Sequence, residues 1–161
     1  MERIYPRFAL GAVGAVLVKE DRMLLVKRGS PPGRGLWSLP GGLIKPGERV
    51  GEAARRELRE ETGLDGEPLG VIYVLNNVVL DQEGSARYHY IILDVLFDPD
   101  SIKGELKAGS DALDAKWFSL PEILAGKGVS RIVLKLVHRM LSSGLSYIPL
   151  EYVENIVSES S

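Results

Sequence analysis

The sequence predicts an α+β fold in which helices pack against one mixed β-sheet. Two regions rich in apolar and β-branched residues, at residues 8–29 and 70–97, have the composition of paired strands. Two amphipathic segments, at residues 50–62 and 130–144, have the spacing of helices. No repeat, low-complexity segment or linker interrupts residues 1–161, so we expect a single domain.

The first half of the chain supplies the N-terminal strands and the first helix. Residues 8–29 are expected to form two strands joined by a charged turn, and the Pro- and Gly-rich residues 29–36 a loop. Residues 37–48 follow as a short strand, a Pro-Gly-Gly turn and a Pro-Gly loop. The first helix then covers residues 50–62, and Gly63 ends it as a glycine just past the helix C-terminus does.

The second half adds two more long strands and the last elements. Residues 70–80 and 87–97 are predicted strands separated by a polar turn, and residues 98–115 form a long acidic loop. A short strand at residues 116–120 precedes a small helix that starts at Pro121.

The last amphipathic segment predicts a helix, whereas the tail that follows it predicts no regular structure. Ser130 has the chemistry of an N-cap for the second amphipathic helix, which covers residues 130–144. The tail, residues 145–161, has no clear pattern, and its end is expected to fray.

Composition excludes several classes of protein. The net charge of −2 offers no basic surface for nucleic acid, and the absence of cysteine excludes disulfides and thiol catalysis. The apolar residues 8–18 are too short to span a bilayer and lead into a charged turn without a cleavage region. We therefore expect a cytoplasmic protein that acts without a membrane or nucleic acid.

The helix at residues 50–62 places acids on its apolar side. Its apolar residues lie on one arc of the helical wheel: Val50, Ala53, Ala54 and Leu58. With Glu57 set at 0°, Glu60 and Glu61 lie at about 300° and about 40°, at the edge of that arc or inside it. Arg55 and Arg59 lie on the opposite face, which is expected to be solvated. Three carboxylates thus project toward the protein, where each would cost several kcal/mol without a cation.

A divalent cation explains this arrangement better than the two alternatives. A solvated charged face would place the acids beside Arg55 and Arg59, and Arg56 alone neutralises only part of the charge. Carboxylate oxygens with room for water suit Mg²⁺ or Mn²⁺. Zinc is not expected, because the sequence has no cysteine and its two histidines, His89 and His138, lie elsewhere.

This helix and the loop before it resemble the Nudix box. The pattern is Gly, five residues, Glu, seven residues, then Arg-Glu-apolar-any-Glu-Glu-any-Gly-apolar, and all nine specified positions match. The matching residues are Gly42, Glu48, Arg56, Glu57, Leu58, Glu60, Glu61, Gly63 and Leu64. The box covers 23 residues, and "GLWSLPGG" before it and "WFSL" further on are compatible with the family's layout.

The resemblance implies the Nudix fold, an α/β/α sandwich around a mixed sheet, and hydrolysis of a nucleoside diphosphate linked to another group. It implies that Glu57, Glu60 and Glu61 bind divalent ions with help from a backbone carbonyl of Gly41 or Gly42. It implies that Glu48 helps to bind metal or to orient a water, and that Arg56 fixes the carboxylates by ion pairing. Bound Mg²⁺ or Mn²⁺ would make the acidic site attractive to a diphosphate and lower the pKa of the attacking water.

Residues outside the box are weaker candidates. In relatives, an acid in the loop before the final strand often acts as a base or additional metal ligand. Asp111 is preferred here over Asp114, although both also fit ordinary solvated loop acids. Arg28 or Arg34 would hold a terminal phosphate, unless they are plain surface residues. Trp37 would stack on a base or pack in the core.

The substrate is less well defined. The family's ADP-ribose hydrolases often have a proline about 15 residues past the box, a region that reads Val79-Leu80-Asp81 here. We still favour ADP-ribose, hydrolysed to AMP and ribose 5-phosphate, over a nucleoside triphosphate, oxidised forms included. A non-catalytic nucleotide sensor is a third hypothesis, and it conflicts with the complete set of box acids. We expect a homodimer, formed through the N-terminal strand or the tail "YIPLEYVENIV".

Overall fold

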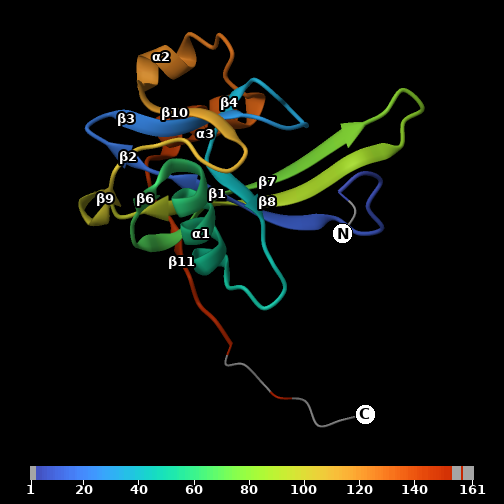
Figure 1. The fold of residues 1–161 in the computed structure, drawn as a ribbon, viewed down its shortest axis with the longest axis horizontal. Helices are drawn as coiled ribbons and strands as arrows, with labels where there is room; N and C mark the ends of the chain where they lie inside the picture. Colours follow the sequence, from blue (N-terminus) through green and yellow to red (C-terminus); the bar gives the residue numbers. More distant parts are fainter. Residues whose placement is uncertain (1–2, 154–156, 158–161) are drawn as a thin grey trace.

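A computed structural model describes residues 3–153 and residue 157 of the chain (Figure 1). The long elements are the strands β1 (Leu10–Val16), β3 (Arg22–Arg28), β7 (Pro68–Leu80), β8 (Ala86–Phe97) and β10 (Ala112–Ser119), with the helices α1 (Val50–Thr62) and α3 (Arg131–Ser143). The short elements are β2 (Val18–Lys19), β4 (Trp37–Ser38), β5 (Gly41–Leu43), β6 (Leu64–Asp65), β9 (Lys103–Gly104), β11 (Ile148–Pro149), α2 (Leu120–Leu124) and the 3₁₀ helix η1 (Pro99–Ser101).

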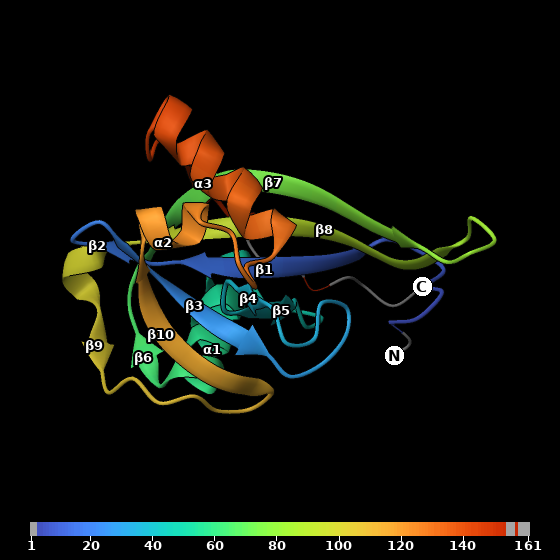
Figure 2. The same ribbon diagram turned by 90° about the horizontal axis from the view of Figure 1, so that it is seen from above.

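The largest sheet is mixed and has the strand order β11-β7-β8-β1-β5. Strand β1 runs parallel to β8 and antiparallel to β5, so it lies between a long strand and the glycine-rich β5. Strands β7 and β8 form a long antiparallel hairpin whose tip extends beyond the rest of the molecule (Figure 2). The predicted mixed sheet with flanking helices is therefore confirmed.

The division of the strands differs from the expected single sheet. Strands β10, β3 and β2 form a second, antiparallel sheet in which β4 also pairs with β3. Strands β6 and β9 form a separate two-stranded sheet. Residues 98–115 are not one continuous loop, because they contain η1, β9 and the start of β10. Asp114 consequently lies in a strand, while Asp111 lies just before it.

Two helices cover opposite sides of the sheets, as Figure 2 shows, and this gives the expected α/β/α arrangement. Helix α1 buries Ala53, Ala54 and Leu58 against one face of the mixed sheet. Helix α3 buries four apolar side chains on the other side: Val133, Leu136, Val137 and Met140. Ser130 accepts a hydrogen bond from the Val133 N–H at 3.3 Å, so the predicted N-cap is present.

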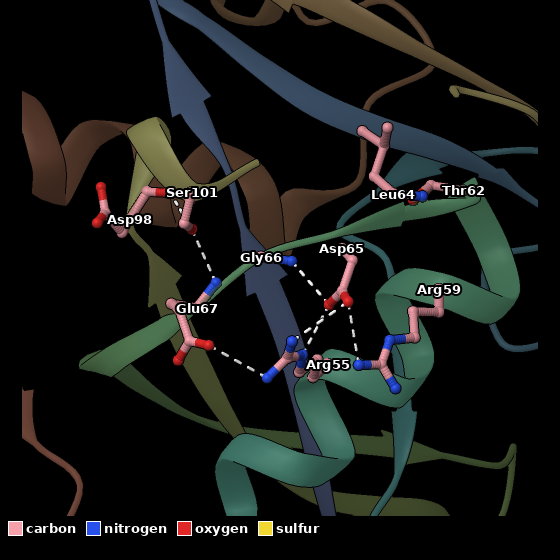
Figure 3. Close-up of polar contacts among 9 residues, drawn as sticks. All are labelled: Arg55, Arg59, Thr62, Leu64, Asp65, Gly66, Glu67, Asp98 and Ser101. Atoms are coloured by element: carbon pink, nitrogen blue, oxygen red, sulfur yellow. Dashed lines mark hydrogen bonds and ion pairs between the residues drawn. The ribbon is translucent and has the colours of Figure 1, made fainter. Parts of the chain in front are cut away.

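The outer face of α1 is held by ion pairs rather than left free in solvent (Figure 3). Arg55 donates to both oxygens of Asp65, at 2.7 Å and 3.2 Å, and Arg59 donates to Asp65 at 3.0 Å. Arg55 also pairs with Glu67 at 3.3 Å. The two guanidinium groups hold the pKa of Asp65 well below its usual range. The expectation of a plainly solvated face was therefore wrong for Arg55, whose side chain is half-buried.

Two other predictions concern membrane-spanning helices and the number of domains. Among the residues that the structure describes, no helix has both the length and the apolar character needed to cross a membrane. The prediction that residues 1–161 form one domain stays a prediction, and the ends of that range lie outside the described residues.

Candidate active site

Helix α1 carries the three glutamates because its apolar residues fix its rotation about the helix axis. Ala53, Ala54 and Leu58 are fully buried, which turns Glu57 and Glu61 toward strand β5. The helix ends at Gly63, whose φ of 74° is left-handed and whose N–H bonds to the Arg59 carbonyl. Local sequence thus sets both the direction of these side chains and the point where the helix stops.

Arg56 lies at the centre of an ion-pair network among the acids. Its guanidinium donates to both oxygens of Glu48, at 2.6 Å and 2.9 Å, and to Glu57 at 2.7 Å. It also reaches Glu60 at 3.3 Å and the Leu43 carbonyl at 3.0 Å. The pairing with Arg56 holds the pKa of Glu48 below its usual range. Arg56 therefore fixes the loop before α1 to the helix itself.

The acidity of Glu61 is strongly perturbed by its surroundings. Burial raises the pKa of Glu61 to about 7, and the negative charges of Glu57 and Asp111 add to the rise. A hydrogen bond of 2.7 Å from the Gly41 N–H and the charge of Arg28 act in the opposite direction. Burial also raises the pKa of Glu57. These acids thus share a partly enclosed space in which their negative charges repel one another.

The glycines of β5 allow the backbone to approach the carboxylates. A Cβ placed on Gly42 would lie 2.5 Å from Oε1 of Glu57, so a side chain there would displace the carboxylate. A Cβ on Gly41 would collide with the Val13 carbonyl of the neighbouring strand. Glycine is therefore required at Gly41, while at Gly42 it leaves the Glu57 carboxylate in place, and the backbone of β5 lies directly beside the acids of α1.

The donor set suits a hard divalent cation, although its oxygens do not converge on one point. Among residues 3–153, no three His, Cys, Asp or Glu side chains are grouped so as to hold a metal ion as they stand. Arg56 holds Glu57 and Glu60, whereas Gly41 holds Glu61. Rotation of these side chains would present carboxylate oxygens, the ligands that Mg²⁺ and Mn²⁺ prefer, and a cation would relieve the repulsion at Glu61.

A cleft of about 850 Å³ adjoins these acids. The glutamates Glu57, Glu60 and Glu61 line it, and so do Gly14 of β1 and Asp94 of β8. A volume of this size matches sites for small organic ligands. The cleft therefore has room for a nucleotide next to the acidic helix.

Comparison with known proteins decides the family. A sequence model of the NUDIX domain matches residues 9–137, which is most of the chain. The protein belongs to the Nudix family.

The Nudix relatives differ in what they are named for. The chain is 38% identical over 109 residues to an ADP-ribose pyrophosphatase of Methanocaldococcus jannaschii, covering 68% of this chain and 61% of the relative. It is 33% identical over 109 residues to an oxidized purine nucleoside triphosphate hydrolase of Danio rerio, covering 67% of this chain and 65% of that relative. The chain thus spans less than two thirds of the length of these curated relatives.

A solved structure supports the same Nudix fold. The MutT NUDIX hydrolase of Burkholderia pseudomallei superposes with a TM-score of 0.70 at 25% identity, covering 82% of this chain and 98% of that one.

The loop before β10 brings Asp111 to the acidic end of this Nudix cleft. The Lys107 N–H bonds to the Thr62 carbonyl at 2.8 Å, and the Gly109 N–H bonds to the Glu61 carbonyl at 3.1 Å. These bonds attach the loop to the end of α1, and Asp111 lines the cleft while remaining exposed. Asp114 is exposed and accepts a hydrogen bond from the Ala115 N–H at 2.8 Å. The structure thus brings Asp111, and not Asp114, to the site.

The other residues singled out in the sequence divide between the cleft and its surroundings. Arg28 lines the cleft and donates to the Pro32 carbonyl at 2.7 Å. Arg34 is exposed and lies outside the lining of that cleft. Trp37 packs edge-on against Phe118 at 4.9 Å and contributes to the core under α3. Of these three candidates, only Arg28 has a position from which it faces the cleft.

Sequence reasoning missed Asp94, which lies in the middle of β8. It is fully buried, lines the Nudix cleft and has no hydrogen-bond partner for either side-chain oxygen. A signal was present in the stretch "YIILDVLF", where one aspartate interrupts an otherwise apolar strand. A polar residue at a buried position is a stronger sign of function than an apolar one, because buried polar groups normally have a hydrogen-bond partner.

Proposed function

We propose that this Nudix protein is a divalent-metal-dependent pyrophosphohydrolase that cleaves ADP-ribose to AMP and ribose 5-phosphate. The observation that carries the proposal is the half-buried Glu61, whose pKa is raised to about 7 beside Glu57 at the edge of the cleft. An acidic site of this kind repels a diphosphate unless cations bind there first. The acids of α1 therefore bind the substrate through a metal and not through direct contact.

The residues of the chain have separate roles in this proposal. Glu57, Glu60 and Glu61 would hold Mg²⁺ or Mn²⁺, with the backbone carbonyl of Gly41 or Gly42 beside them. When bound, the metal polarises the phosphorus centre and lowers the pKa of the attacking water.

Two further residues of the box act around the carboxylates. Arg56 positions them through its ion pairs with Glu48, Glu57 and Glu60. Glu48 would orient a water or complete the metal site, and its two bonds to Arg56 keep it ionised for that role.

Hydrolysis then requires removal of a proton from the attacking water. Water forms a new P–O bond as the bond from phosphorus to the bridging oxygen breaks, and no covalent intermediate is needed. Asp111 is the proposed base or additional metal ligand, because it lines the cleft close enough to Glu61 to raise the pKa of that residue. Arg28 is the proposed contact for a phosphate, and Arg34 and Trp37 are second choices because they lie outside the cleft lining.

A nucleoside triphosphate, oxidised forms included, is the second candidate substrate. The relative from Danio rerio is named for such a reaction, whereas the relative of higher identity, from Methanocaldococcus jannaschii, is named for ADP-ribose. The missing proline in the region of Val79 counts against ADP-ribose. We rank ADP-ribose first because, over matches of the same length of 109 residues, its relative has the higher identity of the two.

The deciding experiment is a substrate panel. Phosphate release coupled to a phosphatase would be measured with ADP-ribose, NADH, diadenosine polyphosphates, the dNTPs and 8-oxo-dGTP, first with Mg²⁺ and then with Mn²⁺. We expect the highest kcat/KM with ADP-ribose. A clear preference for a triphosphate would replace the proposal with the second candidate. No turnover of any substrate by folded protein would favour the sensor hypothesis.

A matched pair of variants tests the role of the acidic helix. Glu61→Gln should reduce turnover at least about 100-fold, while the protein stays folded. Glu52→Gln is the control, because Glu52 lies on the exposed side of the same helix and glutamine can replace it in the N-terminal cap. Equal activity of the two variants would contradict the proposed site.

The remaining expectations concern assembly and location. A homodimer stays our proposal, and light scattering tests it. The exposed Phe8 and Ile148 offer apolar surface near the two chain ends. The tail segment 147–157 lies partly outside the described residues. We also propose a cytoplasmic enzyme that acts on small nucleotides and needs neither nucleic acid nor a membrane.

A further inference from the structure

Asp94 is a buried carboxyl group without a partner. Its exposed fraction is 0%, and its two oxygens are the only buried side-chain polar atoms in the described part of the chain that lack a hydrogen bond. Burying a polar group without a partner costs free energy that folding must offset elsewhere. A native protein that carries such a group calls for an explanation, and a ligand that supplies the missing partner is one.

The carboxyl group lies beneath the cleft that adjoins the acidic helix. Tyr90, Ile92 and Asp94 occupy every second position of β8, so their side chains share one face of the mixed sheet. All three line the cleft. Gly14, opposite Asp94 on β1, also lines it. A Cβ on Gly14 would lie 2.6 Å from Oδ1 of Asp94, so the absence of a side chain at Gly14 leaves room for the carboxyl group.

The distance between Asp94 and the glutamates matches the distance between the base and the phosphates of a nucleotide. Asp94 pairs with Gly14, and Gly14 pairs with Gly41, whose N–H bonds to Glu61. Two strand spacings therefore separate Asp94 from the backbone beside Glu61, which is about 10 Å. In a nucleoside diphosphate the ribose holds the base away from the phosphates by a comparable span. With phosphates at the glutamates, the base reaches the part of the cleft above Asp94.

The chemistry of this carboxyl group fits the amino edge of adenine. Burial raises the pKa of Asp94 to about 7, so the neutral acid, with one O–H donor and one carbonyl acceptor, is well populated at neutral pH. Adenine presents its N6 amino donor beside a ring nitrogen that accepts. A carboxylic acid can form two parallel hydrogen bonds with that edge, and an ionised carboxylate can still accept from N6.

We propose that Asp94 recognises the base of the substrate by accepting a hydrogen bond from the adenine N6 amino group. Asp94 is then a specificity-determining residue of the cleft, and its identification with adenine rests on the function proposed above. Both oxygens are closed to water, and Leu39 packs against the same space over Gly14. Binding of the base therefore includes a displacement of the Leu39 side chain, which uncovers the carboxyl group.

Calorimetry with fragments of the substrate tests this assignment without reference to turnover. The three probes are AMP, purine riboside 5′-monophosphate, which lacks only the N6 amino group, and ribose 5-phosphate. Each would be titrated with Mg²⁺ into the wild type, Asp94→Ala and Asp94→Asn. We expect Asp94→Ala to weaken AMP about tenfold and to leave the other two probes within about twofold. Asp94→Asn keeps an acceptor and should retain most of the preference for AMP.

A second pair of variants tests the same carboxyl group by changing Gly14, its neighbour on β1. Gly14→Ala places a methyl group against Oδ1 of Asp94 and should also weaken AMP, whereas Gly11→Ala is the control on the same strand. The nearest atom to a Cβ on Gly11 is Cδ1 of Ile44 at 3.6 Å, which is an ordinary contact. Loss of AMP affinity in both glycine variants would mean a general effect on β1 and would overturn the assignment.

The outcomes separate this inference from the proposed function. Equal weakening of AMP and purine riboside 5′-monophosphate by Asp94→Ala would overturn the assignment even if the wild type hydrolyses ADP-ribose. A wild type that leaves ADP-ribose intact but binds AMP through N6 in an Asp94-dependent way would overturn the proposed reaction and support the assignment.

Discussion

Replacing Asp94 with asparagine should change how the stability of the protein depends on pH. Burial raises the pKa of Asp94 from 3.8 to about 7 in the folded state. The unfolded chain therefore releases this proton at a lower pH than the folded protein does. Because the folded-state pKa is raised, the contribution of Asp94 to stability is complete below about pH 4 and is lost as the pH rises to about 7. Asparagine has no proton to release and removes this loss.

The size of the effect follows from the two pKa values. They differ by about 3, and a difference of one corresponds to about 1.4 kcal/mol. The free energy of unfolding of Asp94→Asn, relative to that of the wild type, should therefore increase by about 4 kcal/mol between pH 4 and pH 7.5. For a chain of this length the same change corresponds to a rise in Tm on the order of 10 °C.

Urea unfolding at constant ionic strength measures this difference directly. Both proteins would be unfolded with EDTA present, at intervals from pH 4 to pH 8. Glu57 and Glu61 also have raised pKa values, but they are present in both proteins and cancel in the difference. If the stabilities of the two proteins ran parallel across this pH range, the carboxyl group of Asp94 would be ionised or hydrogen-bonded in solution, and the reasoning from its burial would be refuted.

Three more predictions concern the network around α1. Arg56→Ala should lower the free energy of unfolding by about 3 kcal/mol, since it leaves Glu48 and Glu57 without their shared partner; urea unfolding measures the loss, and an unchanged midpoint would contradict it. Asp65→Asn should cost about 2 kcal/mol without changing kcat for ADP-ribose, because Asp65 pairs on the outer face of the helix (Figure 3). Mg²⁺ at 100 times its Kd should add about 2.7 kcal/mol of stability, and thermal melts of Glu61→Gln should lose most of that gain.

The parts of the fold that local sequence determines were predicted well. The bounds of α1, its terminal Gly63 and the N-cap at Ser130 depend on residues within one or two helical turns. The start of β10 at Ala112 was missed because residues 112–115, Ala-Leu-Asp-Ala, include no β-branched or aromatic residue and none of them is buried. Those residues become a strand by pairing with β3, which lies more than 80 residues earlier in the sequence. The division into two sheets depends on the same long-range pairing and has no local signal.

The same distinction separates the acids of α1 from Asp94. Glu57, Glu60 and Glu61 lie within one helix, so their common face could be derived from helical spacing alone. The contact between Asp94 and Gly14 depends on the parallel register of β8 and β1, which residue spacing does not reveal.

The aspartate in "YIILDVLF" nevertheless breaks the local rule for a buried strand, and such breaks are expected at functional sites. If Asp94 were a defect without function, asparagine would improve stability at neutral pH and alanine would leave AMP binding unchanged. If Asp94 binds the base, Asp94→Ala must lose the part of the AMP affinity that depends on the adenine N6 amino group. The pH dependence of unfolding tests whether the carboxyl group is buried without a partner, and the calorimetry tests whether a ligand uses it. Only both results together establish that the free energy lost in folding is recovered in substrate recognition.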